Sequence, residues 1–287
     1  MNAPVIARTI ADLRRIVATW RRAGERVALA PTMGALHAGH ASLVELARTH
    51  GQKVVTSIFV NPTQFAPNED FAKYPRTFDA DVELVAKAGC DMVFAPSPNE
   101  MYGQGFTTTV CLEGPATAGL EDAFRPTHFS GVATVVAKLL IQCAPDVAVF
   151  GEKDFQQLAV IRQMVRDLDL PVEIIGAPTV READGLAMSS RNVYLNAAER
   201  AAAPALHCAL QDCAARIALG EAYERILADG RAAIEMAGFA LDYLELRDAA
   251  TLAAPIDTKA PLRLLAAARM GATRLIDNVH AQNAQES

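Results

Sequence analysis

The 287-residue chain lacks the features that mark several large classes of protein. It has no stretch of about 18 consecutive apolar residues, so we predict no membrane-spanning helix. Residues 1–15 carry charge early and have no long apolar core, which argues against a secretory signal. The formal net charge is −6 and no run of Lys and Arg occurs, so neither nucleic acid nor a membrane is expected as a partner.

Cysteine is scarce, and several diagnostic motifs are missing. The five cysteines are an odd number and contain no C-x-x-C pair, so we expect neither a disulfide framework nor a cysteine zinc site, but reduced thiols in a cytoplasmic protein. No G-x-x-x-x-G-K-[ST] loop and no H-E-x-x-H motif occurs. Gly103 and Gly105 lack the third glycine of a dinucleotide fingerprint and precede a strand-like run at residues 106–112.

Short runs rich in Val and Ile alternate with helical patterns over the first two thirds of the chain. The predicted strands are residues 26–30, 53–60, 91–95, 146–150 and 172–175. The predicted helices are residues 9–22, 40–49, 77–88, 130–142 and 154–167, with Thr9 and Ser130 as N-caps of two of them. Buried strands that alternate with helices are typical of βαβ units, so we predict an α/β fold with a parallel sheet covered on both faces.

The pattern changes after residue 184. An Ala-rich helix is predicted at residues 197–218, where Asn196 and Glu199 form a capping box, and a second helix at residues 221–236. Strand-like runs follow at residues 241–247, 262–269 and 274–277, and residues from 281 on are expected to fray. We therefore predict two domains, residues 1–184 and a smaller α+β domain at residues 185–287.

The most informative segment is PTMGALHAGH at residues 31–40, between a predicted strand and a helix. His37 and His40 are three residues apart and share one face of the first helical turn, while Gly39 leaves room for a ligand. Because a helix N-terminus offers free N–H groups and partial positive charge, this pattern favours a phosphate site over a cap plus a surface histidine. A shared metal ion would need a third ligand, and none is obvious nearby.

Two further segments carry groups that suit phosphate. In GEKDFQQ, residues 151–157, Lys153 can neutralise a phosphate, Asp154 is either a helix cap or a ribose acceptor, and Gln157 faces either the site or solvent. In MSSRN, residues 188–192, two hydroxyls and one guanidinium suit triphosphate oxygens. Neither serine lies in a G-x-S-x-G elbow, so no nucleophilic serine is expected.

A fourth segment, NPTQF at residues 61–65, follows a predicted strand and begins a long loop. Gln64 offers a donor and an acceptor to a small polar substrate, and loops of this length are often functional. Arg125 and His128 in RPTHFSG are candidates either for anion contact or for capping and surface pairing.

Taken together, PTMGALHAGH, SIFVNPTQF, YPRT, RPTHFSGVATVVAKL, FGEKDFQQL, DGLAMSSRN and RLIDN resemble the pantothenate synthetase (pantoate–β-alanine ligase) family. H-x-G-H alone marks the wider nucleotidylyl transferase superfamily, and the other segments narrow the resemblance to this family. The resemblance runs in order from residue 8 to residue 278. It implies a Rossmann-like N-terminal domain, a small C-terminal domain and a homodimer. Thr127 and Asp122-Ala123 depart from the usual family pattern, outside the nucleotide segments.

The resemblance also implies residue roles. His40 is the implied proton donor, and His37, Lys153 and Arg191 complete the catalytic set. Gln64 and Gln157 would bind pantoate, with Gln64 also next to β-alanine. The implied ATP-binding residues are Met33, Gly34, Ala35, Leu36, His37, Ala38, Gly39, His40, Gly151, Glu152, Lys153, Asp154, Val180, Met188, Ser189, Ser190 and Arg191.

The expected reaction is the condensation of pantoate with β-alanine through an acyl adenylate, with release of pyrophosphate and AMP. Neither step needs a protein nucleophile. Mg²⁺ that bridges phosphate oxygens is expected, although its ligands are not readable and Asp79 and Asp81 are only weak candidates. The alternatives are another H-x-G-H nucleotidylyl transferase with a phosphorylated acceptor, a tRNA synthetase fragment, and a non-catalytic nucleotide sensor.

Overall fold

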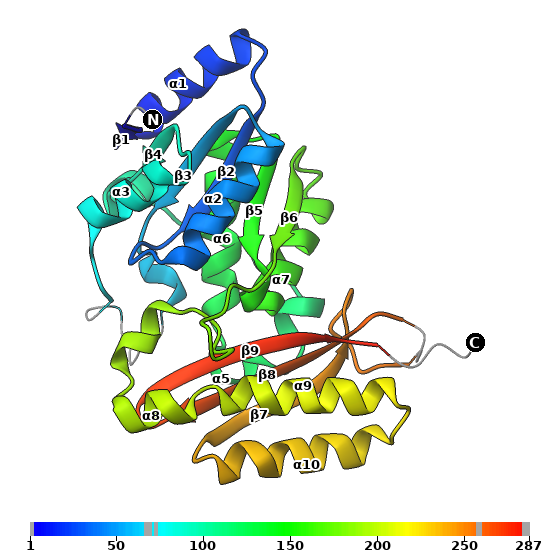
Figure 1. Ribbon diagram of the computed structural model, residues 1–287. Coiled ribbons are helices and arrows are strands. Elements are labelled where there is room, and N and C mark those ends of the chain that lie inside the picture. The colour runs from blue at the N-terminus through cyan, green and yellow to red at the C-terminus, as the bar shows by residue number, and fades with distance from the viewer. Residues whose placement is uncertain (1–2, 66–70, 72–73, 257–259, 283–287) are drawn as a thin grey trace.

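The computed structural model describes residues 3–65, 71, 74–256 and 260–282. Within this part, a six-stranded parallel sheet has the strand order β1-β4-β3-β2-β5-β6 (Figure 1). The strands are β1 (Val5–Ala7), β2 (Val27–Thr32), β3 (Lys53–Ile58), β4 (Met92–Phe94), β5 (Val147–Gly151) and β6 (Glu173–Ala177). The predicted parallel sheet is confirmed. The edge strand β1 was not predicted because its three residues show no pattern.

Helices cover both faces of this sheet. α1 (Ile10–Arg22), α6 (His128–Cys143) and α7 (Phe155–Asp167) pack against one face, and α2 (Ala38–His50) and α3 (Phe78–Lys87) against the other. Alternate residues of β2 contribute to the two hydrophobic cores, because successive side chains of a strand point to opposite faces. The central strands are therefore buried on both sides, as their continuous apolar sequences predict.

The helices predicted at residues 130–142 and 197–218 differ from the structure. Ser130 is not an N-cap: α6 begins at His128, and the Ser130 hydroxyl donates to the Thr127 carbonyl inside the first turn at 2.8 Å. The predicted helix at residues 197–218 is divided into α8 (Ala197–Ala202) and α9 (Ala205–Ala218). Pro204 lies between them and has no N–H to continue the helical hydrogen bonds.

Short helices and turns fill the connections, and the strand expected at residues 106–112 is not formed. The short helices are α4 (Pro98–Met101) and α5 (Glu121–Phe124). The 3₁₀ turns are η1 (Pro62–Gln64), η2 (Gly114–Thr117), η3 (Glu152–Asp154) and η4 (Ser190–Tyr194). Three of these 3₁₀ turns, η1, η3 and η4, contain residues predicted to bind substrates.

The C-terminal region is a separate layer of helices on an antiparallel sheet (Figure 1). Helix α9 and α10 (Tyr223–Met236) pack on β7 (Ala240–Asp248), β8 (Leu262–Met270) and β9 (Thr273–Ala281) around one hydrophobic core. The chain passes from the first sheet to this region after β6 and before α8, so the division between residues 184 and 185 stays a prediction within that stretch. Residues 283–287, most of the tail expected to fray, lie outside the described residues.

A buried ion pair joins the two regions. Arg274 on β9 donates to both carboxylate oxygens of Glu121 on α5 at 2.7 and 2.8 Å, and the Tyr243 hydroxyl donates to Glu121 at 2.9 Å. Burial alone would raise the pKa of Glu121, but the hydrogen bonds and charge of Arg274 hold it below its usual value. Since this carboxylate is charged and fully paired, it fixes α5 against the C-terminal sheet.

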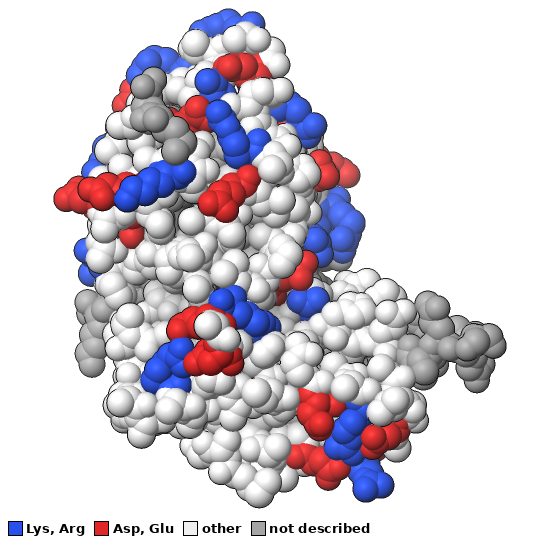
Figure 2. Space-filling view, in the orientation of Figure 1, with Lys and Arg blue, Asp and Glu red and all other residues white. Residues whose placement is uncertain are grey.

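The surface carries mixed charge. On the face in Figure 2, Lys and Arg side chains are interspersed with Asp and Glu side chains among the described residues. No helix in the described part of the chain is long and apolar enough to cross a membrane. The five cysteines, all within the described residues, are free thiols, as the sequence predicts.

Candidate active site

The segments singled out in the sequence follow neighbouring strands of the parallel sheet. Strand β2 pairs with β3 on one side and with β5 on the other, and β5 pairs with β6. The loops after β3, β2, β5 and β6 therefore lie side by side at the carboxyl edge of the sheet. After β2 the chain adds β3 and β4 on one side, and then crosses to add β5 and β6 on the other side. Ligands of such folds bind at the point where the strand order reverses.

These loops line one cavity of about 230 Å³. It contains the imidazoles of His37 and His40, Lys153 after β5, and the Ser189 to Arg191 segment. Gln64 and Gln157 also line it, as do Met33, Gly39, Gly151, Asp154, Val180 and Met188. The three predicted nucleotide segments are thus brought together around a single cavity.

A hairpin returns the MSSRN segment to the cavity after β6. Met188 N–H donates to the Val180 carbonyl at 3.0 Å, and Arg181 pairs with Ala187 in an antiparallel bridge. Gly185 makes the turn with a φ of +94°, a conformation that other residues rarely adopt.

The two histidines form a reciprocal cap at the start of α2. Nδ1 of His37 accepts from Gly39 N–H at 3.2 Å, and Nδ1 of His40 accepts from His37 N–H at 3.3 Å. The helix begins at Ala38, two residues earlier than predicted, so His37 is its N-cap residue. Because both Nδ1 atoms accept hydrogen bonds, each neutral ring carries its proton on Nε2. The cap and the phosphate-site interpretations are therefore compatible.

Both imidazoles are neutral in the free protein. Burial, followed by the electrostatic influence of His37 and Lys153, lowers the pKa of His40 to about 3. Burial is also the main reason why the pKa of His37 is lowered, followed by the charge of Lys153. The cavity therefore presents two Nε2–H donors near the charged Lys153 ammonium.

Gly39 leaves room for the His37 ring. A Cβ at residue 39 would lie 3.0 Å from both Cε1 and Nδ1 of His37, which is closer than such contacts normally are. In the sequence, this glycine is interpreted as leaving room for a ligand. The structure adds a reason within the protein itself, because any side chain here would displace the capping imidazole.

Asp81 shapes the loop before the histidines, a role that sequence reasoning missed. Its carboxylate is 2% exposed and accepts from the N–H groups of Ala35 at 3.0 Å and Leu36 at 2.8 Å. Gly34 and Ala35 there have positive φ angles of +87° and +51°, so the two hydrogen bonds hold a strained turn. Asp81 does not line the cavity, and neither does Asp79, so neither supports the weak expectation of a Mg²⁺ ligand.

Lys153 and Asp154 lie in the 3₁₀ turn after β5. The Lys153 ammonium is 3.8 Å from the Asp154 carboxylate, and both line the cavity. Asp154 is the N-cap residue of α7, as one of its two interpretations predicts, but its side chain makes no capping hydrogen bond. Glu152 does not line the cavity, because its carboxylate pairs with Arg263 of β8 at 3.1 Å.

Gln64 is held from several directions. Its Nε2 contacts the Met33 sulfur at 2.8 Å and its Oε1 accepts from Asn61 at 3.1 Å. Arg125 and His128 both contact the Gln64 carbonyl oxygen, at 3.3 and 3.0 Å, and also line the cavity. The two residues therefore orient the Gln64 loop.

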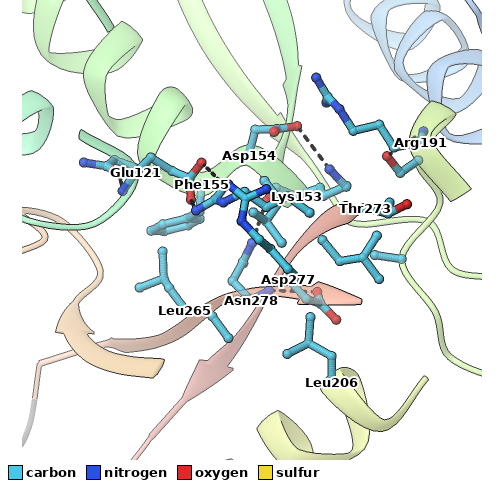
Figure 3. Close-up of a pocket in the computed structure, with 18 of the residues that line it drawn as sticks. Glu121, Lys153, Asp154, Phe155, Arg191, Leu206, Leu265, Thr273, Asp277 and Asn278 are labelled. Carbon is cyan, nitrogen blue, oxygen red and sulfur yellow. Dashed lines mark hydrogen bonds and ion pairs between the residues drawn. The ribbon is translucent and has the colours of Figure 1, made fainter. Parts of the chain in front are cut away.

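A second cavity of about 540 Å³ continues from the first toward the C-terminal sheet (Figure 3). Lys153, Asp154, Gln157 and Arg191 line both cavities, which therefore form one cleft between the two regions. The remaining predicted residues, Gly34, Ala35, Leu36, Ala38 and Glu152, line neither cavity, and their contact with ATP stays a prediction.

The described residues contain no group of three or more His, Cys, Asp or Glu side chains that could hold a metal ion. Asp154 is the one carboxylate that lines the smaller cavity among them. This donor set fits a Mg²⁺ ion bound mainly by phosphate oxygens rather than one held by the protein alone.

A six-stranded parallel sheet with an H-x-G-H helix start at its switch point defines a Rossmann-like nucleotide-binding α/β protein. A family model described as pantoate-beta-alanine ligase matches residues 5–280. The chain belongs to the pantoate–β-alanine ligase family.

Individual relatives agree with this assignment. A pantothenate synthetase of Rhodopseudomonas palustris is 58% identical over 278 residues, which cover 96% of this chain and 98% of the relative. The crystal structure of pantothenate synthetase from Thermus thermophilus superimposes with a TM-score of 0.92 at 47% identity, covering 97% of this chain and 99% of that one. A ligase from Francisella tularensis, complexed with β-γ ATP and β-alanine, has a TM-score of 0.80 at 33% identity, covering 97% and 98%.

Proposed function

We propose that this ligase condenses pantoate with β-alanine in the cavity at the carboxyl edge of the parallel sheet, with ATP as co-substrate and a pantoyl adenylate as intermediate. The observation that carries the proposal is that His37, His40, Lys153 and Arg191 line one cavity with Gln64 and Gln157. Cationic and N–H donor groups thus lie beside amides suited to a polar hydroxy acid. The bound ATP and β-alanine of the Francisella relative support the same substrates.

In the first step a pantoate carboxylate oxygen attacks the α-phosphorus of ATP. A new P–O bond forms, and the bond to the leaving pyrophosphate breaks. The Nε2–H groups of His37 and His40, with Lys153 and Arg191, stabilise the negative charge that develops on phosphate oxygens. The implied proton-donor role of His40 is best satisfied by its neutral Nε2–H, because its low pKa disfavours an imidazolium in the free protein.

In the second step the β-alanine amine attacks the adenylate carbonyl. The new C–N bond gives pantothenate, and the C–O bond to AMP breaks. Gln64 and Gln157 orient pantoate through amide hydrogen bonds in both steps. Gln64 is suited to this task, since Met33, Asn61 and the α6 segment already fix its position.

Magnesium enters this proposal only as an ion that arrives with the nucleotide. When bound, it would neutralise phosphate charge. Asp154 is the cavity carboxylate placed to help hold it, and the salt bridge to Lys153 keeps that carboxylate at the cavity edge.

One assay tests the reaction. Purified protein is given ATP, pantoate and β-alanine, and AMP and pyrophosphate are measured with each substrate omitted in turn. We expect pyrophosphate release to require pantoate and AMP release to require both acids. Pyrophosphate release that needs a phosphorylated acceptor instead of pantoate would support the nucleotidylyl transferase alternative.

The homodimer is proposed on the family resemblance alone, and the cytoplasmic location on the five free thiols. Light scattering after size-exclusion chromatography tests the first, with an expected mass of twice the 30.7 kDa chain. A mass equal to one chain at micromolar concentration would contradict it. Cell fractionation tests the second.

A further inference from the structure

The last strand of the C-terminal sheet reaches the lysine loop of the candidate site. Asn278 on β9 is 3% exposed, and its Nδ2 donates to the backbone carbonyls of Glu152 at 2.9 Å and Lys153 at 2.8 Å. Figure 3 shows Asn278 on its strand beside the loop that carries Lys153 and Asp154. Both hydrogens of one side-chain amide therefore hold two consecutive residues of η3.

Arg263 on β8 fixes the orientation of this amide. Its Nε donates to Oδ1 of Asn278 at 2.6 Å, and its Nη2 donates to the Glu152 carboxylate at 3.1 Å. The guanidinium carbon also lies 4.3 Å from the centre of the Phe155 ring. Because the Asn278 oxygen is occupied by a donor, its NH₂ group must face the two carbonyls, and a flipped amide would lose all three hydrogen bonds.

The position of the Lys153 ammonium depends on these bonds. Lys153 belongs to a three-residue turn between β5 and α7, and its side chain lines both parts of the cleft. Asn278 binds the carbonyl of Lys153 itself, so a shift of this loop moves the base of the lysine side chain. A displacement of about 1 Å in a reacting group can reduce a rate by roughly 10²-fold.

We infer that Asn278, oriented by Arg263, is a positioning residue that holds Lys153 against the nucleotide phosphates during adenylate formation. This inference rests on the proposed function, because it assigns Lys153 to that step. It also gives the C-terminal sheet a defined part in the reaction: β8 and β9 set the geometry of a charged group that the N-terminal sheet supplies.

A double-mutant cycle in the full-length enzyme tests the inference, with AMP release as the assay. The variants are Asn278→Ala, Lys153→Met and their combination. We expect Asn278→Ala to lower kcat about 10- to 30-fold while the KM values for ATP and pantoate change less than about threefold. In the Lys153→Met background the same substitution should lower kcat by less than about threefold, because the ammonium group through which Asn278 acts is absent.

Tyr243→Phe is the matched control. It removes one hydrogen bond to Glu121 at the same boundary between the two regions, and among the described residues no hydrogen bond joins Tyr243 to residues 152–154. Its kcat should remain within about twofold of wild type if only the lysine loop matters to this step.

The outcomes separate two failures. The positioning role of Asn278 is overturned if the loss of kcat in the double variant equals the product of the two single losses. It is also overturned if kcat is unchanged in Asn278→Ala. Wild-type activity of Lys153→Met instead removes the lysine from the proposed mechanism, and this inference falls with it. If Asn278→Ala does not fold, Asn278→Ser retains one donor and replaces it. A kcat loss that vanishes in the Lys153→Met background supports the inference, whereas a persistent loss or none overturns it.

Discussion

His40 should make the stability of this protein depend on pH in a way that a His40→Asn variant does not. The pKa of His40 is lowered from 6.5 to about 3, chiefly by burial. Between these two values the unfolded chain binds a proton at this position and the folded chain does not. Protonation of the unfolded state therefore favours unfolding. The free energy of unfolding falls progressively as the pH is lowered from 6.5 toward 3.

The magnitude follows from the two pKa values. From about pH 7.5 to about pH 5.0 the unfolded His40 gains nearly a full proton, which removes roughly 2 kcal/mol of stability from the wild type. The His40→Asn variant has no group that titrates at this position, so the wild type should lose about 2 kcal/mol more than the variant over this range. Other titrating groups contribute similarly to both proteins and largely cancel in the comparison.

Urea unfolding at each pH measures the difference. The single tryptophan, Trp20, packs partly buried against the core of the N-terminal sheet, so its fluorescence reports the unfolding of the region that contains His40. A His50→Asn variant serves as control, since His50 lies exposed at the end of α2. Equal pH dependence in wild type and His40→Asn would show that the imidazole keeps an ordinary pKa, and the reasoning from burial would be refuted.

Three further substitutions test other parts of the structure. Lys153→Ala should lower the rate of adenylate formation by about 10²- to 10³-fold through loss of one charge-stabilising donor, and a rate near wild type would contradict its role. Gly131→Ala should destabilise the protein by about 1–3 kcal/mol in urea unfolding, since its Cβ would lie 2.4 Å from the Thr63 carbonyl oxygen. Asp81→Asn leaves one backbone N–H unpaired and should cost about 1–3 kcal/mol, whereas the exposed Asp79→Asn should be neutral.

The sequence predicts most of the main sheet because its signals are local. Continuous apolar strands and amphipathic helices need only a few neighbouring residues to be recognised, and the capping box at Asn196 and Glu199 is confirmed for the same reason. The convergence of the candidate site follows from strand order, in which β2 lies between β3 and β5. The general rule for parallel sheets gives the edge at which ligands bind, but only the structure shows which strands, and therefore which loops, are neighbours at that edge.

Long-range contacts were the part that sequence could not predict. Asn278 and Lys153 are 125 positions apart, and no periodicity or spacing joins them. Asp81 also acts at long range, since its carboxylate accepts a hydrogen bond from the N–H of Ala35, 46 positions away. The misplaced cap at Ser130 has a different cause: His128 and Phe129 are buried, so packing extends α6 past the residue with the better capping side chain.

Two consecutive residues of β9 hold opposite sides of the candidate site. Asn278 binds the lysine loop, while the carboxylate of Asp277 accepts from Arg181 at 2.7 and 2.9 Å, at the base of the hairpin that returns MSSRN to the cavity. Burial would raise the pKa of Asp277, but His207 and Arg181 hold it below its usual value, so the carboxylate is charged and the pair is retained.

Since a strand is stiff over two residues, β9 cannot move relative to the lysine loop without also straining the hairpin. One short piece of the C-terminal sheet therefore connects the loop that carries Lys153 with the hairpin that precedes Arg191. Under the proposed function, this link gives the C-terminal region a part in the active site, because Lys153 and Arg191 are the two cations proposed to contact the same triphosphate.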